Sequence, residues 1–258
     1  MENLEFSSIK ILIADLDDTL APSKLPIDNE MANLVDHLLD RMDMAVISGA
    51  KYEQFQYQLV QELKMSFEKF SRMYLLPTNG SAAYNFKEGK WNKVYSDPLT
   101  ENEKNRIMDA IRLVVESFNF ASPKNIYGDQ IEDRNTQITY SALGQKAPIE
   151  LKRVWDNDLT KRKILKKELE ILLPQFSVQI GGTTSIDITK KGRDKAYGIK
   201  KLMEITGYTK EEMCFMGDKL EEGGNDYSVK SLGINCIRVN NVQEAKSILR
   251  EIVGSLAT

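Results

Sequence analysis

The chain has 258 residues, of which 41% are hydrophobic and 28% charged, as in an ordinary globular protein of one large domain or two smaller ones. The formal net charge of −3 argues against a nucleic-acid-binding protein that depends on a basic surface. No stretch approaches the roughly 18 consecutive apolar residues of a membrane helix. The N-terminus lacks the pattern of a secretory signal and there are only two cysteines, so a cytoplasmic protein without a membrane partner is expected.

The first predicted strand, Ile9–Ala14, runs directly into a cluster of carboxylates. Asp15 and Asp17 lie two residues apart, and the hydroxyl of Thr19 follows two residues later. Both carboxylates would project from the carboxyl end of the strand, where they repel each other unless a metal ion or a proton intervenes. A solvated turn with an aspartate as helix cap is the alternative interpretation, but one aspartate suffices for a cap.

Apolar strands and amphipathic helices alternate through the first third of the chain. Repeated βα units predict a mainly parallel, doubly wound, Rossmann-like α/β sheet with its site at the carboxyl ends of the strands. The second apolar strand ends in Ser48-Gly49, at the edge where the first ends in Asp15. After the first strand, the predicted elements are the helix Asp28–Met42, the strand Met44–Ile47, the helix Tyr52–Leu63 and the strand Met73–Leu76.

The pattern changes after about Tyr84. A glycine-containing turn within Phe86–Trp91 predicts a hairpin. Thr100 and Glu103 have the spacing of a capping box, ahead of an apolar helical stripe. This region therefore predicts a mixed α+β segment rather than more βα units. Its later elements are the helix Thr100–Asn119, the strand-like runs Gln137–Leu143 and Ser177–Thr189, and the charged helix Leu159–Leu172.

The βα alternation returns after Lys190. We therefore expect an α/β core formed by residues 1–84 and 187–258, interrupted by an inserted α+β domain at residues 85–186. The last predicted elements are the helix Lys195–Ile205, the strands Met213–Met216 and Asn235–Val239, and the closing helix Val242–Leu256.

Four short motifs occur in a fixed order at the ends of these predicted strands and helices. They resemble the four signatures of the haloacid-dehalogenase-like (HAD) superfamily of phosphatases and phosphomutases. The first motif is only moderately specific by itself, and Ser-Gly or a lysine at a helix start is weak, but the order and context of all four are specific. The motifs are Asp15-x-Asp17-x-Thr19, Ser48-Gly49, Lys195 at a helix start, and Gly217-Asp218 followed by Asn225-Asp226.

This resemblance implies phosphoryl transfer with Asp15 as the nucleophile, since a carboxylate that attacks phosphorus divides one difficult displacement into two easier ones. Asp17 would protonate the leaving alkoxide and then activate the next acceptor. The remaining implied roles are phosphate binding by Thr19, Ser48, Gly49 and Lys195, Mg²⁺ binding by Asp15, the Asp17 carbonyl and Asp218, and orientation of Lys195 and metal-bound water by Asn225 and Asp226.

An insertion between the second and third signatures is the position of type-C2 caps in this superfamily. Nearly the whole chain resembles the eukaryotic-type phosphomannomutases and related sugar phosphatases of that subgroup. By this resemblance Arg134, Ser185 and Asp187 would contact a sugar or its distal phosphate. A surface ion pair of Arg134 with Glu132 or Asp133 is the alternative. The expected partner is a small phosphorylated substrate; a homodimer is compatible with the resemblance, but the oligomeric state is open.

Two positions depart from the mutase pattern. Gln145 and Lys152 stand where the resemblance leads us to expect arginines. Because a mutase must hold one phosphate while the other reacts, the loss of two guanidinium groups weakens mutase activity more than hydrolysis. The sequence therefore favours a Mg²⁺-dependent sugar-phosphate phosphatase over a phosphomannomutase. A non-catalytic phosphosugar-binding or regulatory protein is the alternative from another class.

Overall fold

The computed structural model describes residues 6–118, 120, 123 and 125–255. The chain forms two compact units, one of which is the continuous segment Asp97–Arg193. The other unit contains the chain up to Ser96 and from Asp194 onward. This discontinuous unit is built on a mainly parallel seven-stranded sheet, and the continuous one on an antiparallel four-stranded sheet. The predicted fold class, an α/β core with an inserted α+β segment, is therefore confirmed.

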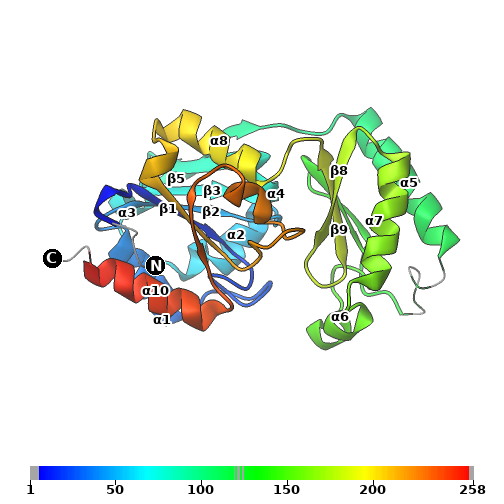
Figure 1. The fold of residues 1–258 in the computed structure, drawn as a ribbon, viewed down its shortest axis with the longest axis horizontal. Helices are drawn as coiled ribbons and strands as arrows, with labels where there is room; N and C mark the ends of the chain where they lie inside the picture. Colours follow the sequence, from blue (N-terminus) through cyan, green and yellow to red (C-terminus); the bar gives the residue numbers. More distant parts are fainter. Residues whose placement is uncertain (1–5, 119, 121–122, 124, 256–258) are drawn as a thin grey trace. The chain divides into compact units, whose positions relative to one another are not determined.

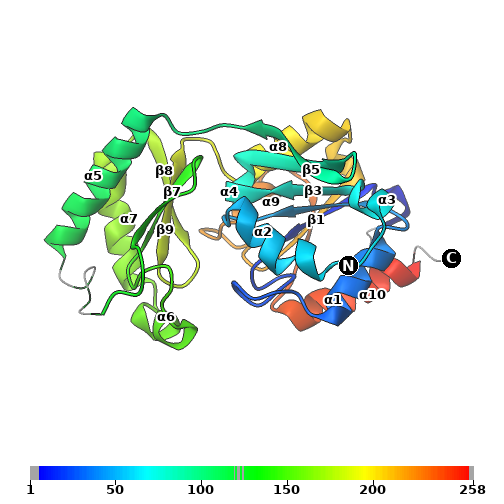
Figure 2. The ribbon, with the colours of Figure 1, turned by 180° about the vertical axis from the view of Figure 1, so that it is seen from behind.

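The seven-stranded sheet has the order β11-β10-β1-β2-β3-β4-β5 (Figures 1 and 2). The five strands from β11 to β3 are parallel, whereas β4 and β5 pair antiparallel at one edge. The chain fills the sheet outward from β1 in one direction and later adds β10 and β11 on the other side of β1. The strands are β1 Ile11–Asp15, β2 Asp43–Ile47, β3 Met73–Leu76, β4 Ala82–Lys87, β5 Lys90–Ser96, β10 Met213–Gly217 and β11 Asn235–Arg238.

Helices cover both faces of this sheet. On β1, Leu12 and Ala14 pack in one hydrophobic cluster, and Ile11 and Ile13 pack in the cluster on the opposite face. Such a strand, buried on both sides, reads as a continuous apolar run in the sequence. The first cluster includes residues of α1, α2 and α10, and the second includes residues of α8 and α9. The helices are α1 Asn29–Leu38, α2 Tyr52–Gln58, α3 Phe67–Phe70, α4 Pro77–Gly80, α8 Lys195–Thr206, α9 Tyr227–Lys230 and α10 Val242–Ser255.

The order of the strands places β1 at the point where the direction of winding reverses. β1 lies between β10 and β2, so the residues that follow β1 and β10 flank this switch point. In open α/β sheets, ligands bind beyond the carboxyl ends of the strands at such a point. Asp15 ends β1, and Asp218 directly follows β10.

The borders between the two units differ from the expected ones. The hairpin of β4 and β5 was expected in the inserted domain, but it extends the seven-stranded sheet because β4 pairs with β3. At the second border, the strand that begins at Ser185 continues to Lys190 within the four-stranded sheet. The division therefore falls after Ser96 and after Arg193, rather than at residues 85 and 186.

The inserted unit, Asp97–Arg193, has one apolar and one polar face on its sheet, which has the order β6-β7-β9-β8. Ile138 and Ile188 belong to a hydrophobic cluster with residues of the two long helices. The alternate positions on the same strands carry polar side chains, among them Thr139 and Asp187. The elements are α5 Glu101–Ser117, β6 Ile131–Asp133, β7 Gln137–Ser141, α6 Ile149–Trp155, α7 Thr160–Leu172, β8 Phe176–Gly181 and β9 Ser185–Lys190.

The helix boundaries follow the local capping chemistry. The capping box at the start of α5 is confirmed, since the Thr100 side chain accepts from Glu103 N and the Glu103 side chain accepts from Thr100 N. The helix predicted to end at Leu63 stops at Gln58 and continues as the short 3-10 helix Val60–Glu62. The predicted helix ends at Asn119 and Leu256 lie outside the described residues. A further 3-10 helix, Phe6–Ser8, precedes β1, and another, Lys210–Glu212, precedes β10.

A left-handed turn within α4 links two parts of the core. Thr78, Asn79 and Gly80 all have positive φ angles, of 49°, 55° and 79°. The amides of Thr78 and Asn79 donate to the carbonyls of Ala50 and Ser48. A Cβ placed on Gly80 would lie 2.2 Å from the Cα of Gly198 in α8, so both positions need glycine. The turn thus fixes the Ser48 loop and the helix that begins at Lys195.

We expect Gly198→Ala to destabilise the protein by about 2 kcal/mol, because its Cβ would lie 2.7 Å from the Cα of Gly80 and 2.9 Å from Ile47 Cδ1. Urea-induced unfolding measures the loss. Gly254→Ala is the matched control, since Gly254 is exposed in α10 and a Cβ added there would have no atom within 4 Å; this change should add about 0.5–1 kcal/mol of helix stability. Equal effects of the two substitutions would contradict the packing argument.

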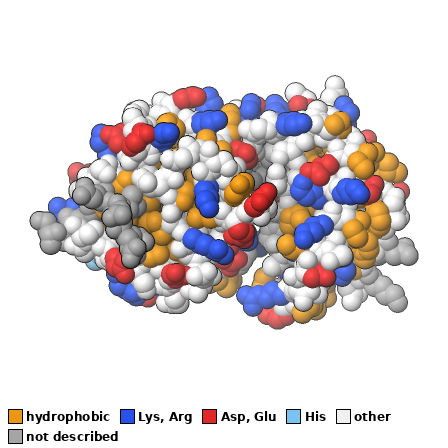
Figure 3. Space-filling view, viewed as in Figure 1, with side chains coloured by type: hydrophobic (Ala, Val, Ile, Leu, Met, Phe, Trp, Pro, Cys, Tyr) orange, Lys and Arg blue, Asp and Glu red, His pale blue; other side chains and the backbone are white. Residues whose placement is uncertain are grey.

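Within the described ranges, every helix is too short or too polar to span a bilayer. Acidic and basic side chains are interspersed over the face drawn in Figure 3. Such a mixed face lacks the single-signed field that non-specific nucleic-acid binding requires.

Candidate active site

Asp15 and Lys195 form a buried ion pair at the carboxyl end of β1. Lys195 is the first residue of α8, which Asp194 caps by accepting from the amide of Tyr197. Its Nζ lies 2.5 Å from Asp15 Oδ1 and 2.5 Å from Asp226 Oδ1. Lys195 is 1% exposed, Asp15 3% and Asp226 0%. One ammonium group therefore bridges two carboxylates in an environment almost free of solvent.

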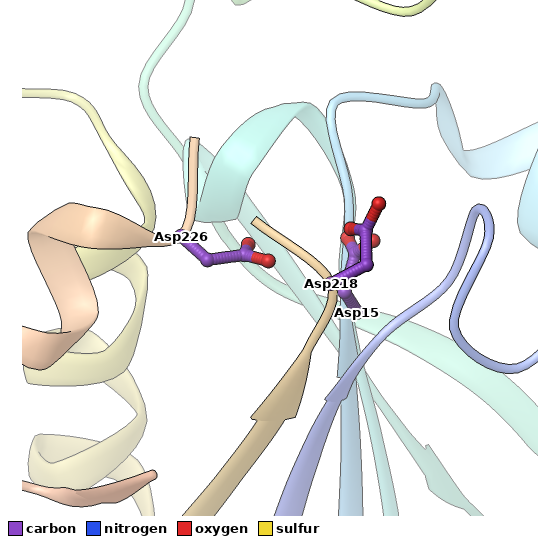
Figure 4. A group of neighbouring side chains, drawn as sticks. All are labelled: Asp15, Asp218 and Asp226. Atoms are coloured by element: carbon purple, nitrogen blue, oxygen red, sulfur yellow. The ribbon is translucent and has the colours of Figure 1, made fainter. Parts of the chain in front are cut away.

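A third carboxylate completes an acidic group. Oxygen atoms of Asp15, Asp218 and Asp226 all lie within 4.8 Å of one another. Figure 4 shows Asp15 and Asp218 at the ends of their strands, with the Asp226 carboxylate pointing toward them from the segment before α9. Asp218 Oδ2 pairs with Lys219 Nζ at 2.8 Å, whereas its Oδ1 is buried and has no hydrogen-bond partner among the described residues.

The electrostatics of this group favour a bound cation. Burial, reinforced by Asp226 and Asp218 and opposed by Lys195, raises the pKa of Asp15 to about 7. Burial also raises the pKa of Asp218. Although burial opposes it, the ion pairs with Asp15 and Asp226 raise the pKa of Lys195, which stays charged. Three carboxylates against the two ammonium groups of Lys195 and Lys219 leave excess negative charge, which a metal ion would neutralise.

The donor set suits a hard divalent cation. All three side chains offer oxygen ligands, and the buried Asp218 Oδ1 lacks a hydrogen-bond partner within the described part of the chain. The sequence placed Asp15, Asp17 and Asp218 around the metal, with Asp226 outside. The structure also brings the Asp226 carboxylate close to those of Asp15 and Asp218. Asn225 directly precedes Asp226 in the turn between β10 and α9.

Two hydroxyl groups lie on the segments that end β1 and β2. Thr19 is fully buried, and its Oγ1 has no hydrogen-bond partner among the residues described. Ser48 is 3% exposed, and its Oγ accepts from the amide of Ala50 across Gly49. A buried hydroxyl that makes no hydrogen bond within the protein is a suitable donor for a ligand oxygen.

Asp17 lies in a tight turn and is held at one oxygen. Asp18 has a φ of 63°, and its amide donates to the carbonyl of Ala21. Asp17 Oδ1 accepts from the amide of Lys24 at 2.7 Å and from Gln58 Nε2 at 3.2 Å. The carboxyl group of Asp17 is therefore anchored, while the residue stays half-buried beside the end of β1.

In the inserted unit, Ser185 and Asp187 share the polar face of β9. Asp187 Oδ1 accepts from the hydroxyl of Thr139 at 2.8 Å. Arg134 lies between β6 and β7, where its Nε and Nη2 both contact Glu132 Oε2 at 2.8 Å. The ion pair considered as the alternative for Arg134 thus exists.

Gln145 and Lys152, the two departures from the mutase pattern, are in direct contact. Lys152 Nζ donates to the carbonyl of Gln145 at 2.9 Å, and Lys152 is only 4% exposed. Gln145 Nε2 is buried without a hydrogen-bond partner in the described residues. The two positions therefore form one polar cluster, in which an ammonium and an amide stand where the family resemblance led us to expect two planar guanidinium groups.

Two polar side chains beside the site were not predicted from the sequence. Lys219 follows Asp218 directly, so its position in the Gly217-Asp218-Lys219 run was a usable signal. Gln58 lies 41 residues after Asp17, in a helix whose pattern shows only which residues face the core. No local pattern connects it to Asp17.

Comparison with solved structures supports the same fold. A haloacid dehalogenase-like hydrolase from Bacteroides thetaiotaomicron matches with a TM-score of 0.63 and 18% identity, over 95% of this chain and 99% of the other. Plasmodium falciparum IMP-nucleotidase, truncated at its N-terminus, matches with a TM-score of 0.69 and 20% identity, over 96% and 71%. The fold and the ordered motifs define a member of the HAD superfamily.

The sequence comparisons are more specific. Residues 31–255 match the model of the eukaryotic phosphomannomutase family, and the chain belongs to this family. Human phosphomannomutase 1 is 27% identical over 227 residues, which cover 85% of this chain and 82% of the human protein. The phosphomannomutase of Schizosaccharomyces pombe is 25% identical over 224 residues, with coverage of 85% and 84%.

Proposed function

We propose that this protein is a Mg²⁺-dependent phosphohexose mutase that transfers a phosphoryl group through an aspartyl-phosphate on Asp15. The observation that carries the proposal is the buried bridge of Lys195 between Asp15 and Asp226, with Asp17 two residues beyond the nucleophile. A surface cap or a structural ion pair does not need two buried carboxylates bridged by one lysine, with a third carboxylate beside them. Similarity to phosphomannomutases over 85% of the chain favours mutase chemistry over simple hydrolysis.

In the first half-reaction, a carboxylate oxygen of Asp15 attacks phosphorus and the bond from phosphorus to the sugar oxygen breaks. Asp17 gives its proton to the departing alkoxide, which leaves an acyl-phosphate on Asp15. In the second half-reaction, Asp17 takes the proton of a different sugar hydroxyl, and that oxygen attacks the acyl-phosphate. Asp15 is thereby regenerated, and the phosphoryl group has changed position on the sugar.

The other core residues bind the transferring group. Lys195, held 2.5 Å from Asp15, is placed to neutralise oxygens that gain negative charge during transfer. The hydroxyls of Thr19 and Ser48 would donate to the same oxygens. Asp15, Asp218 and Asp226 would hold Mg²⁺, which when bound offsets the repulsion between the phosphoryl group and the nucleophile.

We assign the selection of a small phosphorylated sugar to the inserted unit. Arg134 offers a guanidinium group, which recognises phosphate in a bidentate manner, and Asp187 offers an acceptor for sugar hydroxyls. Ser185, on the same face of β9 as Asp187, adds a hydroxyl. The proposed substrate is therefore a phosphohexose. The proposed location is the cytoplasm, in which such sugars are metabolised.

Hydrolysis of a sugar phosphate is the second candidate, because of Gln145 and Lys152. Their contact forms one cluster with a single point charge. Such a cluster holds a distal phosphate less tightly than two arginines. A sugar that dissociates before the second transfer would leave the aspartyl-phosphate on Asp15, and water would then accept the phosphoryl group instead of the sugar hydroxyl.

Incubation with mannose 1-phosphate, Mg²⁺ and a hexose bisphosphate, followed by phosphorus NMR, tests the proposal. We expect mannose 6-phosphate with little free phosphate. Free phosphate as the main product would overturn the mutase assignment in favour of the phosphatase. If a broad panel of phosphoesters gave no turnover of either kind, the non-catalytic binding hypothesis would replace both. The double variant Gln145→Arg/Lys152→Arg is the matched comparison: it should raise the ratio of mutase to phosphatase product.

A further inference from the structure

Gln58 is a fully buried polar residue at the end of α2. It is 0% exposed, although it belongs to a helix that otherwise buries apolar residues such as Phe55. A glutamine at this depth must satisfy its amide by specific hydrogen bonds, since the desolvation of an unpaired amide destabilises the fold. The partners of this amide identify its role.

The side chain of Gln58 reaches the loop that follows β1. Its Nε2 donates to Asp17 Oδ1 at 3.2 Å and to the carbonyl of Leu25 at 2.9 Å. The backbone carbonyl of Gln58 accepts from the amide of Ile27 at 2.8 Å. Because both amide hydrogens meet oxygen acceptors, the amide orientation is defined: the reverse orientation would bring oxygen against oxygen.

The same amide leaves its own acceptor unsatisfied. Gln58 Oε1 is buried with no hydrogen-bond partner among the described residues. A residue selected only for packing would do better as an apolar side chain of similar length. The retained amide is therefore explained by what Nε2 does at Asp17 rather than by the stability of the core.

We propose that Gln58 is a positioning residue for Asp17: with the amide of Lys24 it occupies Oδ1, so that Oδ2 is the atom that exchanges protons with the substrate. A protonated Asp17 then carries its hydrogen on Oδ2, because Oδ1 already faces two donors. Oδ2 gives this proton to the departing alkoxide and takes one from the accepting hydroxyl. The inference rests on the proposed function, in which Asp17 is the general acid and base.

Leaving groups of different basicity test this role. A sugar alkoxide needs a proton to depart, whereas p-nitrophenolate departs as the anion. For Gln58→Met, we expect single-turnover phosphorylation of the enzyme by mannose 1-phosphate to fall about 10- to 100-fold, within the range of general acid catalysis. With p-nitrophenyl phosphate the rate should fall less than about threefold. Rapid quenching measures both rates on the same preparation, so their ratio does not depend on the folded fraction.

Gln54→Met, one turn earlier in α2 and half-buried, is the matched control and should leave the ratio unchanged. Gln58→Glu keeps the shape of the side chain but replaces the amide donor with an oxygen. It should lower the ratio of the rate with mannose 1-phosphate to the rate with p-nitrophenyl phosphate, as Gln58→Met does. Equal losses with both substrates, or no loss with the sugar phosphate, would overturn the role of Gln58 alone. A wild-type enzyme that acquires no phosphate on Asp15 from either substrate would overturn the proposed function and this inference with it.

Discussion

Asp15→Asn is expected to abolish turnover while the protein stays folded. The amide cannot form the acyl-phosphate, so the rate should fall at least about 10³-fold, equivalent to roughly 4 kcal/mol of barrier. Phosphate release and isomerisation of mannose 1-phosphate are the measurements. Asp109→Asn, in α5 of the inserted unit and remote in sequence from the four motifs, is the control and should retain full activity. A residual rate within about tenfold of the wild type would exclude Asp15 as the nucleophile.

The same substitution should stabilise the metal-free protein. Asp15→Asn removes one of the two buried carboxylates that share the Lys195 ammonium, beside a third at Asp218, which we expect to raise the free energy of unfolding by about 1–2 kcal/mol. The folded-state pKa of Asp15, about 7, lies above its ordinary value of 3.8, so ionisation of Asp15 destabilises the fold as the pH rises between these values.

The stabilisation by Asp15→Asn should therefore increase with pH. In EDTA, the Tm of Asp15→Asn should exceed that of the wild type by an amount that grows from about pH 4 to pH 7 and then levels off. Thermal unfolding at several pH values measures it. A difference that shrinks as the pH rises would mean that Lys195, rather than burial, controls the ionisation of Asp15.

Lys195→Met is expected to have the largest effect on stability. It leaves Asp15 and Asp226 buried without the ammonium that bridges them at 2.5 Å. Removing one partner of a buried ion pair typically costs about 3–5 kcal/mol, because the remaining charge is not compensated. Urea-induced unfolding in EDTA measures this loss, and activity should fall at least about a hundredfold because the transferring oxygens lose a charged donor.

The double variant Lys195→Met/Asp226→Asn separates the two contributions. It removes one of the stranded charges, so about half of the lost stability should return, whereas the lost activity should not. If Lys195→Met were as stable as the wild type in EDTA, the ion-pair bridge would have no role in the fold. An exposed ion pair such as Lys201 with Glu204 should contribute less than about 1 kcal/mol in the same assay.

Sequence patterns were sufficient for the core of the fold. The apolar run that ends in Asp15 and the βα alternation predict a parallel sheet, because strands buried on both faces and amphipathic helices have distinct periods. The hairpin of β4 and β5 was assigned to the wrong unit. Its residues show that the segment is extended, but only tertiary pairing with β3 shows which sheet it joins. The short helix Ile149–Trp155 was missed because its pattern is brief and lacks a capping side chain.

The residues of the candidate site likewise fall into two groups: those whose position the sequence predicts and those whose position depends on tertiary packing. Asp15, Ser48 and Asp218 follow predicted strands, so the topology alone brings them to one edge of the sheet. The contact of Asp226 with Lys195 was expected only from the family resemblance, and the place of Asp226 beside Asp218 depends on how the loop after β10 turns. The anchoring of Asp17 by Gln58 depends on the depth at which α2 ends. Such contacts are set by packing and have no sequence period.

The insertion of the Asp97–Arg193 unit also has a consequence for the order of folding. β1 pairs with β10 in a register that joins Ile11 to Met213, so the central strand lacks one neighbour until almost the entire chain has been synthesised. The inserted unit is continuous and has its own hydrophobic cluster, so its contacts close much shorter loops. During synthesis, this unit can therefore become ordered while the core still awaits α8 and its lysine.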